Sequence, residues 1–312
     1  MQSPAEAKAK IAGPIPGLPV LFNDDDTINH AGMRDHVQFL MENGIQAVLL
    51  SIGISEYYVL TEAEVRSIFT NVARAADGRL LVLGSTGPWP TRQAVEFARF
   101  AEGSGIGALV IKAPDTESLA YAPSVHDDAL YEHFEAVAAA TQLGILFHEK
   151  VIYARGTNRP WSMDLIKRMT RIDNVIGLKE ESWDFLYSLE ILSAVGDRLS
   201  MIDDASKWSF ILTYAKGAPA YVSGIAQFAP QVSMRFWEAL KADDLVEARR
   251  IIVDIEVPIS QLMLQVGWVG FVKAAMEICG LPSSPLRKPG VSLSSEQKRR
   301  VKDLLTRLEI LR

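Results

Sequence analysis

The chain has 312 residues, of which 48% are hydrophobic, and a formal net charge of −6 at pH 7. These values predict a folded protein of one large or two ordinary domains, and they exclude a disordered chain and a basic nucleic-acid-binding surface. Its single cysteine excludes a disulfide framework and a cysteine-based metal cluster. No apolar segment resembles a secretory signal or approaches the length that spans a bilayer, so the expectation is a cytoplasmic protein with no membrane partner.

Short apolar runs alternate with amphipathic stretches along the chain. The runs are apolar on both faces, as in parallel strands that are covered on both sides. The stretches between them contain residues that signal where a helix begins or ends. Examples are the capping box of Thr61 with Glu64 at a helix start and Gly44 at a helix end. The pattern predicts an α/β fold, a (β/α)8 (TIM) barrel, with a doubly wound sheet as the alternative. The predicted strands cover residues 18–22, 46–51, 80–84, 108–113, 144–148, 175–179, 199–203 and 220–224.

The chain stays helical after the last predicted strand. This is more helix than one barrel needs, so we expect a C-terminal helical extension, with prolines in its last linker. The predicted domains are a catalytic barrel over residues 1–229 and a helical domain over residues 230–312. The predicted helices of this domain cover residues 230–241, 244–264, 267–280 and 294–309.

A lysine ends one predicted strand, in the segment NVIGLKEES at residues 174–182. In one interpretation Lys179 marks an exposed strand end and pairs with Glu180 or Glu181. In the other it is a catalytic amine at the carboxyl end of a barrel strand, where barrel enzymes have their active sites. An apolar wall would lower the pKa of Lys179, and Gly177 would leave room for a substrate. A neutral amine could then attack a ketone and form a Schiff base.

The sequence resembles the dihydrodipicolinate synthase/N-acetylneuraminate lyase family of class I aldolases over nearly the whole chain. The resemblance implies a (β/α)8 barrel with a C-terminal helical domain, and a Schiff-base-forming role for Lys179. It implies a lyase that acts on pyruvate or another 2-oxo acid as a homodimer or homotetramer, and we expect no metal or other cofactor. Val222 and Ser223 would line the pocket. The matching segments are NVIGLKEES, SMIDDA, GAPAYVSGIAQFAP and VKAAMEICGLPSSPLRKP.

The loop that binds the substrate carboxylate in this family reads Gly-Thr-Thr-Gly-Glu, and here it reads IGISE at residues 52–56. Glu56 is kept, whereas Gly53 and Ile54 stand at the two hydroxyl positions. Backbone N–H groups can still form an anion-binding nest. The predicted carboxylate-binding residues are therefore Gly53, Ile54, Ser55 and Glu56.

The family has a proton-relaying tyrosine on the fifth strand, and Phe147 stands in its place in the segment ILFHEK. A phenyl ring cannot transfer a proton. Strand alternation places Glu149 on the same side as Phe147 and Lys179, and turns His148 away unless the strand ends before it. We therefore predict that Glu149 or His148 moves protons. The other predicted substrate contacts in this region are Phe147, Tyr153 and Arg155.

The main prediction is a Schiff-base-forming lyase or aldolase for a small 2-oxo acid, with Lys179 as the amine. One alternative is an aldolase or dehydratase for a 2-keto-3-deoxy sugar acid, which Arg155 or Arg159 would favour by pairing with a second carboxylate. Another is a barrel that binds a 2-oxo acid without turnover, because the threonine and tyrosine relay of the family is missing.

Overall fold

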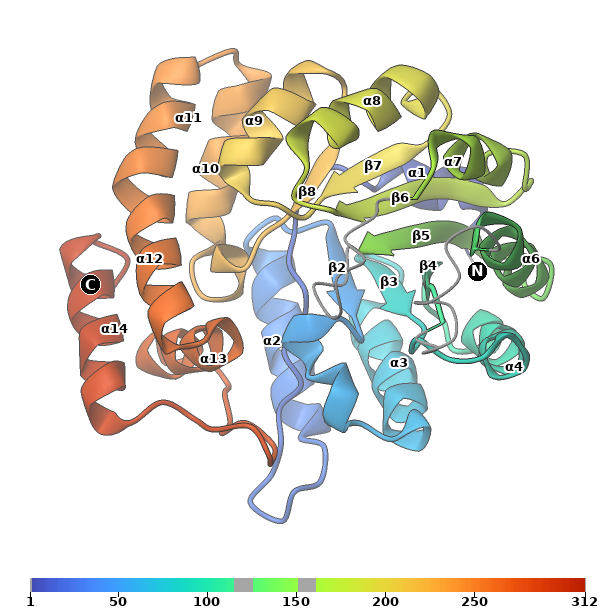
Figure 1. The fold of residues 1–312 in the computed structure, drawn as a ribbon. Coiled ribbons are helices and arrows are strands. Elements are labelled where there is room, and N and C mark those ends of the chain that lie inside the picture. The colour runs from blue at the N-terminus through green and yellow to red at the C-terminus, as the bar shows by residue number, and fades with distance from the viewer. Residues whose placement is uncertain (1, 115–125, 151–160, 312) are drawn as a thin grey trace. The chain divides into compact units, whose positions relative to one another are not determined.

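The computed structural model describes residues 2–114, 126–150 and 161–311. Eight strands alternate with helices along the chain and belong to one eight-stranded sheet, which confirms the predicted (β/α)8 barrel (Figure 1). A helical region follows the last strand. The chain forms two compact units: Met1–Gly13 with Leu81–Val222, and Pro14–Leu80 with Ser223–Arg312. The predicted domain boundary after residue 229 stays a prediction.

The first unit contains neighbouring parallel strands with helices between them. In Figure 1 the helices α4, α6, α7 and α8 follow one another along the outside of these strands. The N-terminal helix α1 packs against two of the same strands. The strands are β3 (Leu81–Ser85), β4 (Ala108–Lys112), β5 (Gly144–Lys150), β6 (Val175–Glu181), β7 (Ser200–Asp203) and β8 (Ala220–Val222). The helices are α1 (Pro4–Ala9), α4 (Thr91–Gly103), α6 (His126–Ala138), α7 (Met163–Met169), α8 (Phe185–Val195) and α9 (Lys207–Ala215).

The register of β4, β5 and β6 determines which side chains share a face. Lys112 of β4 lies opposite His148 of β5, and His148 lies opposite Lys179 of β6. Farther down the strands the register of β5 and β6 shifts between Ile145 and Leu146. Because cross-strand neighbours lie on the same face of a sheet, Lys112, His148 and Lys179 form one row.

The second unit contains most of β1 (Gly13–Ile15), all of β2 (Ala47–Leu50) and the C-terminal helices. The predicted first strand at residues 18–22 is wrong, because Pro19 has no N–H for a ladder and strand β1 ends before it. The predicted helix at 244–264 consists of two α-helices joined by a π-helical turn. The helical elements are α2 (His30–Glu42), η1 (Gly53–Ser55), η2 (Tyr57–Val59), α3 (Glu62–Ala76), η3 (Ile225–Gln227), α10 (Pro230–Lys241), α11 (Leu245–Ile251), η4 (Ile252–Glu256), α12 (Val257–Val266), α13 (Trp268–Ile278) and α14 (Ser295–Arg307).

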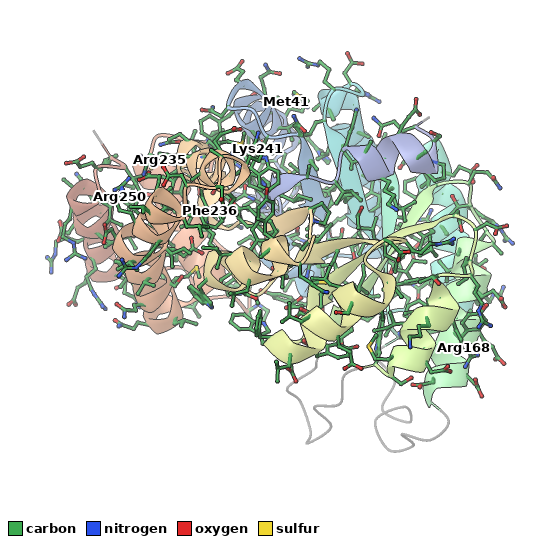
Figure 2. The ribbon with its side chains drawn as sticks, turned by 90° about the horizontal axis from the view of Figure 1, so that it is seen from above. Met41, Arg168, Arg235, Phe236, Lys241 and Arg250 are labelled. Atoms are coloured by element: carbon green, nitrogen blue, oxygen red, sulfur yellow. The ribbon has the colours of Figure 1, made fainter. Side chains whose placement is uncertain are left out.

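Charged side chains link neighbouring helices within each unit. In the first unit Arg168 of α7 pairs with Asp128 of α6, with 2.6 Å between nitrogen and oxygen. In the second unit Arg235 of α10 pairs with Glu247 of α11, which also pairs with Arg250 of its own helix. Figure 2 shows the three labelled arginines at the surface of their helices. Exposed pairs of this kind contribute little to stability, so buried apolar side chains hold the helices in place.

Among the helices that the structure describes, none is by itself long and apolar enough to cross a bilayer. One bent pair, Leu245–Val266 with Trp268–Ile278, has the necessary length and composition when the two helices are taken together.

Candidate active site

Lys179 is the centre of a buried polar cluster in the first unit. Its side chain is 1% exposed, and its Nζ lies 2.8 Å from Oε2 of Glu181 and 2.5 Å from Oδ2 of Asp204. The third neighbour is Nε2 of His148, also at 2.8 Å. Three neighbouring strand ends thus supply the cluster: β5 supplies His148, β6 supplies Lys179 and Glu181, and Asp204 follows β7. Lys179 does pair with a glutamate, but it does not mark an exposed strand end.

The carboxylates beside Lys179 determine its protonation state. Burial disfavours the ammonium form, but Asp204 and Glu181 outweigh burial and raise the pKa of Lys179 to about 12. The predicted lowering of this pKa is wrong, because the wall around the amine is acidic and not apolar. The amine is therefore an ammonium group in the free protein, and it must lose a proton before it can attack a ketone.

His148 is placed to take that proton. Burial and the Lys179 ammonium lower the pKa of His148 to about 3, although the neighbouring Glu181 favours the protonated form. A neutral imidazole has one nitrogen that accepts a hydrogen bond. Nε2 of His148 faces both Nζ of Lys179 and Oε2 of Glu181, which lies 2.7 Å away. Two groups are therefore within reach of the ammonium proton: Nε2 of His148, and the carboxylate of Glu181, whose Oε2 lies 2.8 Å from Nζ.

Phe147 and Glu149 share one face of the fifth strand, as predicted, but the prediction that Lys179 lies on that face is wrong. The register pairs His148 with Lys179, so His148 shares the face of the amine, and Glu149 is paired with Glu180 on the other face. The ring of Phe147 is fully buried and lies 4.7 Å, between centroids, from an aromatic ring of α6. A change of one residue in strand phase moves every side chain to the opposite face. Phe147 therefore packs toward the helices, and Glu149 is not brought to the amine.

We expect Glu149 to make the stability of the protein depend on pH instead. Burial, and then the charge of Glu180, raise the pKa of Glu149 from its ordinary 4.5 to about 8. The folded chain thus holds a proton that the unfolded chain releases, so this stabilisation is complete below pH 4.5 and is lost as the pH rises through 8. Between these values we expect the native free energy of unfolding to fall by about 1.4 kcal/mol per pH unit relative to Glu149→Gln. Urea denaturation across this pH range measures the difference, and parallel curves for the two proteins would contradict it.

Two pairs of adjacent acidic residues lie near Lys179: Glu180 with Glu181, and Asp203 with Asp204. The first residue of each pair has a structural role. Glu180 accepts a hydrogen bond from a hydroxyl of α8 at 2.7 Å, and Asp203 accepts one from a hydroxyl of α9 at 2.6 Å. Strand alternation then turns Glu181 and Asp204 toward Lys179. The sequence reasoning missed Glu181 and Asp204 as site residues. Their positions in the sequence were the available signal. Glu181 follows the lysine by two residues, and Asp204 is the second residue of an Asp-Asp pair.

Gly177 serves strand packing. A Cβ at this position would lie 2.5 Å from the backbone oxygen of Ser200 and 3.1 Å from the side chain of Leu146. The prediction that Gly177 leaves room for a substrate is therefore wrong. The missing side chain allows β6 to lie close to its neighbouring strands.

Glu56, which was predicted to bind a substrate carboxylate, is part of a buried ion pair in the second unit. Its side chain is 1% exposed and pairs with Lys273 of α13, which is 2% exposed. It also accepts the backbone N–H of Arg287 at 3.1 Å. Glu56 thus fastens its loop to the C-terminal segment. The sequence reasoning missed Lys273, although a lone lysine in the apolar stretch WVGFVKAAMEI was a signal.

The rest of this loop is held by internal contacts. The hydroxyl of Ser55 donates to the carbonyl oxygen of Leu18 at 2.6 Å. Ile54 is buried, and a Cβ on Gly53 would lie 3.0 Å from the ring of Trp268. The hydroxyl of Ser55 is therefore engaged within the protein, and carboxylate binding by the backbone of this loop stays a prediction.

The remaining predicted residues are placed as follows. Val222 is half-buried at the end of β8. Ser223 is buried, and its hydroxyl shares a hydrogen bond of 2.7 Å with Ser233 of α10. Tyr153 and Arg155 lie outside the described residues. Within the described residues, no group of three or more histidine, cysteine, aspartate or glutamate side chains is arranged to hold a metal ion.

Comparison with known proteins agrees with the fold. A model of the Dihydrodipicolinate synthetase family matches residues 10–308. The solved structure of dihydrodipicolinate synthase from Oceanobacillus iheyensis has a TM-score of 0.87 at 24% identity, and it covers 98% of this chain and 99% of that chain. At this identity the likeness supports the barrel fold.

Two curated relatives are similar in sequence. The "Probable 5-dehydro-4-deoxyglucarate dehydratase" of Acidovorax ebreus is 26% identical over 312 residues, which are 98% of this chain and 99% of that protein. The "Probable 5-dehydro-4-deoxyglucarate dehydratase 2" of Streptomyces coelicolor is 30% identical over 272 residues, which are 86% of this chain and 80% of that protein. With the family match over nearly the whole chain, this protein belongs to the dihydrodipicolinate synthetase family and is a lyase of that family.

Proposed function

We propose that Lys179 forms a Schiff base with the ketone of a 2-oxo acid, and that the protein then breaks a carbon–oxygen or carbon–carbon bond of that substrate. The observation that carries the proposal is the buried amine of Lys179, whose Nζ lies 2.8 Å from Nε2 of His148. The amine lies at the carboxyl ends of parallel barrel strands, where enzymes of this fold have their active sites. A buried lysine beside a proton acceptor is equipped for nucleophilic attack.

The contacts suggest an order of events. The Lys179 ammonium gives a proton to Nε2 of His148 or directly to Glu181, both of which lie 2.8 Å from Nζ. The neutral amine attacks the ketone carbon, and the adduct loses water to give a protonated imine. The imine draws electrons from the next carbon, which releases a proton to give an enamine. The enamine then expels a hydroxyl group, which takes up the proton released in the previous step and leaves as water. Hydrolysis of the imine that remains frees the product and restores the amine of Lys179.

Dehydration is the first candidate among the reactions that an enamine allows. Both curated relatives described above are named as dehydratases of 5-dehydro-4-deoxyglucarate, and one of them matches this chain over almost its full length. Aldol cleavage of a 2-keto-3-deoxy sugar acid uses the same enamine and is the second candidate. Location in the cytoplasm and a homodimeric or homotetrameric assembly belong to the same proposal.

Trapping with borohydride tests the Schiff base. The native protein is incubated with pyruvate and borohydride, and its intact mass is measured. We expect a reduced pyruvyl adduct, together with exchange of the pyruvate methyl protons for deuterium in heavy water. An adduct without exchange would indicate a barrel that binds 2-oxo acids without turnover. Failure to trap pyruvate or longer 2-oxo acids would exclude the Schiff-base mechanism.

Replacing His148 by asparagine should lower kcat by about 10²- to 10⁴-fold, because the acceptor of the Lys179 proton is removed. Deuterium exchange into pyruvate gives the rate without knowledge of the natural substrate. His133→Asn is the matched control, because His133 is also buried in the first unit but hydrogen-bonds to Thr91 of α4 at 3.0 Å. Equal exchange rates in the native protein and in His148→Asn would show that another group takes the proton.

A further inference from the structure

Of the two carboxylates beside the amine of Lys179, that of Asp204 is the nearer. Its Oδ2 is 2.5 Å from Nζ, whereas Oε2 of Glu181 is 2.8 Å away. The side chain of Asp204 is 20% exposed, and that of Lys179 is 1% exposed. The carboxylate therefore extends from the buried nitrogen toward the surface of the first unit. A ligand joined to the nitrogen would lie beside it.

The turn that carries Asp204 is firmly held. The N–H of Asp204 donates to the carbonyl oxygen of Glu180 at 2.9 Å. The preceding Asp203 accepts a hydrogen bond from the hydroxyl of Thr213 at 2.6 Å. Ser206, two residues after Asp204, has a φ of 143°, which residues with a side chain rarely adopt. Such strain persists where the surrounding contacts enforce it, and it is common at active sites. These contacts fix Asp204 beside the amine.

Formation of a Schiff base changes the contacts of the nitrogen. The three hydrogens of the Lys179 ammonium match its three neighbours, which are Nε2 of His148, Oε2 of Glu181 and Oδ2 of Asp204. A protonated imine has one hydrogen on nitrogen, so two of these contacts are lost. His148 and Glu181 still contact each other at 2.7 Å. The carboxylate of Asp204 is then the group that can turn from the nitrogen to the substrate.

The charge on the nitrogen determines when Asp204 binds a proton. Burial raises the pKa of Asp204 above its ordinary 3.8, the Lys179 ammonium opposes this shift, and the charge of Glu181 adds to it. The nitrogen is positive in the protonated imine and neutral in the enamine, so the opposing charge disappears as the enamine forms. Asp204 thus becomes a stronger base while the carbon next to the imine loses its proton.

We propose that Asp204 is the catalytic base of the enamine step, which takes the proton from the carbon next to the imine. This inference rests on the proposed Schiff base at Lys179. The imine carbon is bonded to Nζ, and the carbon that loses the proton is bonded to the imine carbon. A carboxylate oxygen 2.5 Å from Nζ is therefore within hydrogen-bonding reach of a hydrogen on that carbon.

The step balances without another reactant. The carbon–hydrogen bond breaks, its electron pair forms the double bond of the enamine, and the electron pair of the imine double bond moves to the nitrogen. The proton bonds to Asp204. In a dehydration the nitrogen pair forms the imine again, the carbon–oxygen bond breaks, and the hydroxyl group leaves as water with the proton of Asp204. Pyruvate has no such hydroxyl group, so Asp204 returns the proton to the same carbon.

Replacing Asp204 by asparagine separates Schiff-base formation from the enamine step. Exchange of the pyruvate methyl protons for deuterium should fall by about 10²- to 10⁴-fold in Asp204→Asn, because the base is lost. Borohydride trapping of pyruvate, measured by intact mass, should be no slower than in the native protein. Asp204 is one of the two carboxylates that raise the pKa of Lys179, so its loss makes the neutral amine easier to form. A residue with a merely structural role would slow both reactions.

Two further variants test whether the acid itself is needed. Asp204→Glu keeps a carboxylate on a side chain that is one methylene longer, and it should recover part of the exchange that Asp204→Asn loses. Asp197→Asn removes an exposed aspartate of the same unit, and it should trap pyruvate and exchange its protons as the native protein does. Circular dichroism compares the folding of the three variants with that of the native protein.

The outcomes separate this inference from the proposed function. Native exchange in Asp204→Asn would overturn the inference, because another group would then take the proton. An equal loss of trapping and exchange would also overturn it, because Asp204 would then support the amine alone. Trapping without exchange in the native protein would leave the Schiff base intact and refute the role of Asp204. If the native protein traps neither pyruvate nor longer 2-oxo acids, the Schiff base is absent and the inference falls with it.

Discussion

Replacement of Lys179 by arginine is expected to abolish the borohydride adduct and to reduce turnover by about 10⁴-fold or more. A guanidinium group stays protonated and cannot form an imine with a ketone. It can still pair with Glu181 and Asp204, which lie 2.8 Å and 2.5 Å from the native amine. Intact mass after incubation with pyruvate and borohydride measures the adduct, and deuterium exchange into pyruvate measures turnover.

Arginine is a better replacement than alanine for this experiment. Lys179→Ala would leave two carboxylates beside a cavity without their cation, and a loss of activity could then reflect a loss of folding. Lys179→Arg keeps the charge, and its circular dichroism and thermal midpoint should stay close to those of the native chain. An adduct that persists in Lys179→Arg would identify another amine, with Lys112 as the first to examine, and would refute the role given to Lys179.

Replacement of Lys273 by methionine is expected to lower the free energy of unfolding by about 3–5 kcal/mol. Lys273 is 2% exposed, and it is the cation next to Glu56, which is 1% exposed. Its Nζ also donates to the carbonyl oxygen of Pro285 at 3.2 Å and lies 4.8 Å from the centroid of the Phe22 ring. Burial lowers the pKa of Lys273, while the charge of Glu56 opposes this shift. Removing the cation leaves a buried carboxylate without compensation, and urea denaturation measures the loss.

A second variant separates the lost charge from the lost packing. The double variant Glu56→Gln with Lys273→Met removes the charge of Glu56 as well, so it should recover most of the stability. Lys298→Met is the control for an exposed pair, because Lys298 and Glu277 are 37% and 54% exposed, and it should cost less than about 1 kcal/mol. If Lys273→Met cost no more than this control, Glu56 would tolerate the loss of its partner, and its structural role would be refuted.

The role of Glu56 shows that a matching motif residue can be structural in this chain. Glu56 matches the last residue of the carboxylate-binding loop of the family, but its two oxygens bind Lys273 and the N–H of Arg287. Arg287 also pairs with Glu64 at 2.8 Å. The loop and the C-terminal segment are thus fastened together by buried charges. Variants of Glu56 should therefore be examined for stability before any effect on activity is interpreted as catalytic.

The sequence by itself determined the barrel and the position of Lys179. Runs that are apolar on both faces, separated by capped helices, are compatible with few folds other than a covered parallel sheet. The segment NVIGLKEES placed a lysine near the end of β6, and the structure has it there, almost fully buried. These features are local, because strand and helix periodicity and the residue at a strand end depend on a few neighbouring positions.

The tertiary structure decided which side chains surround that lysine. The pairing of His148 with Lys179 depends on how β5 is aligned with β6, and a change of one residue would have brought Phe147 or Glu149 to the amine. The contact with Asp204 depends on the neighbouring strand in the same way. The pKa of Lys179 follows from these contacts, so the direction of its shift could not be predicted from the strand alone. Strand register and burial are set by packing between distant segments, and no short stretch of sequence contains that information.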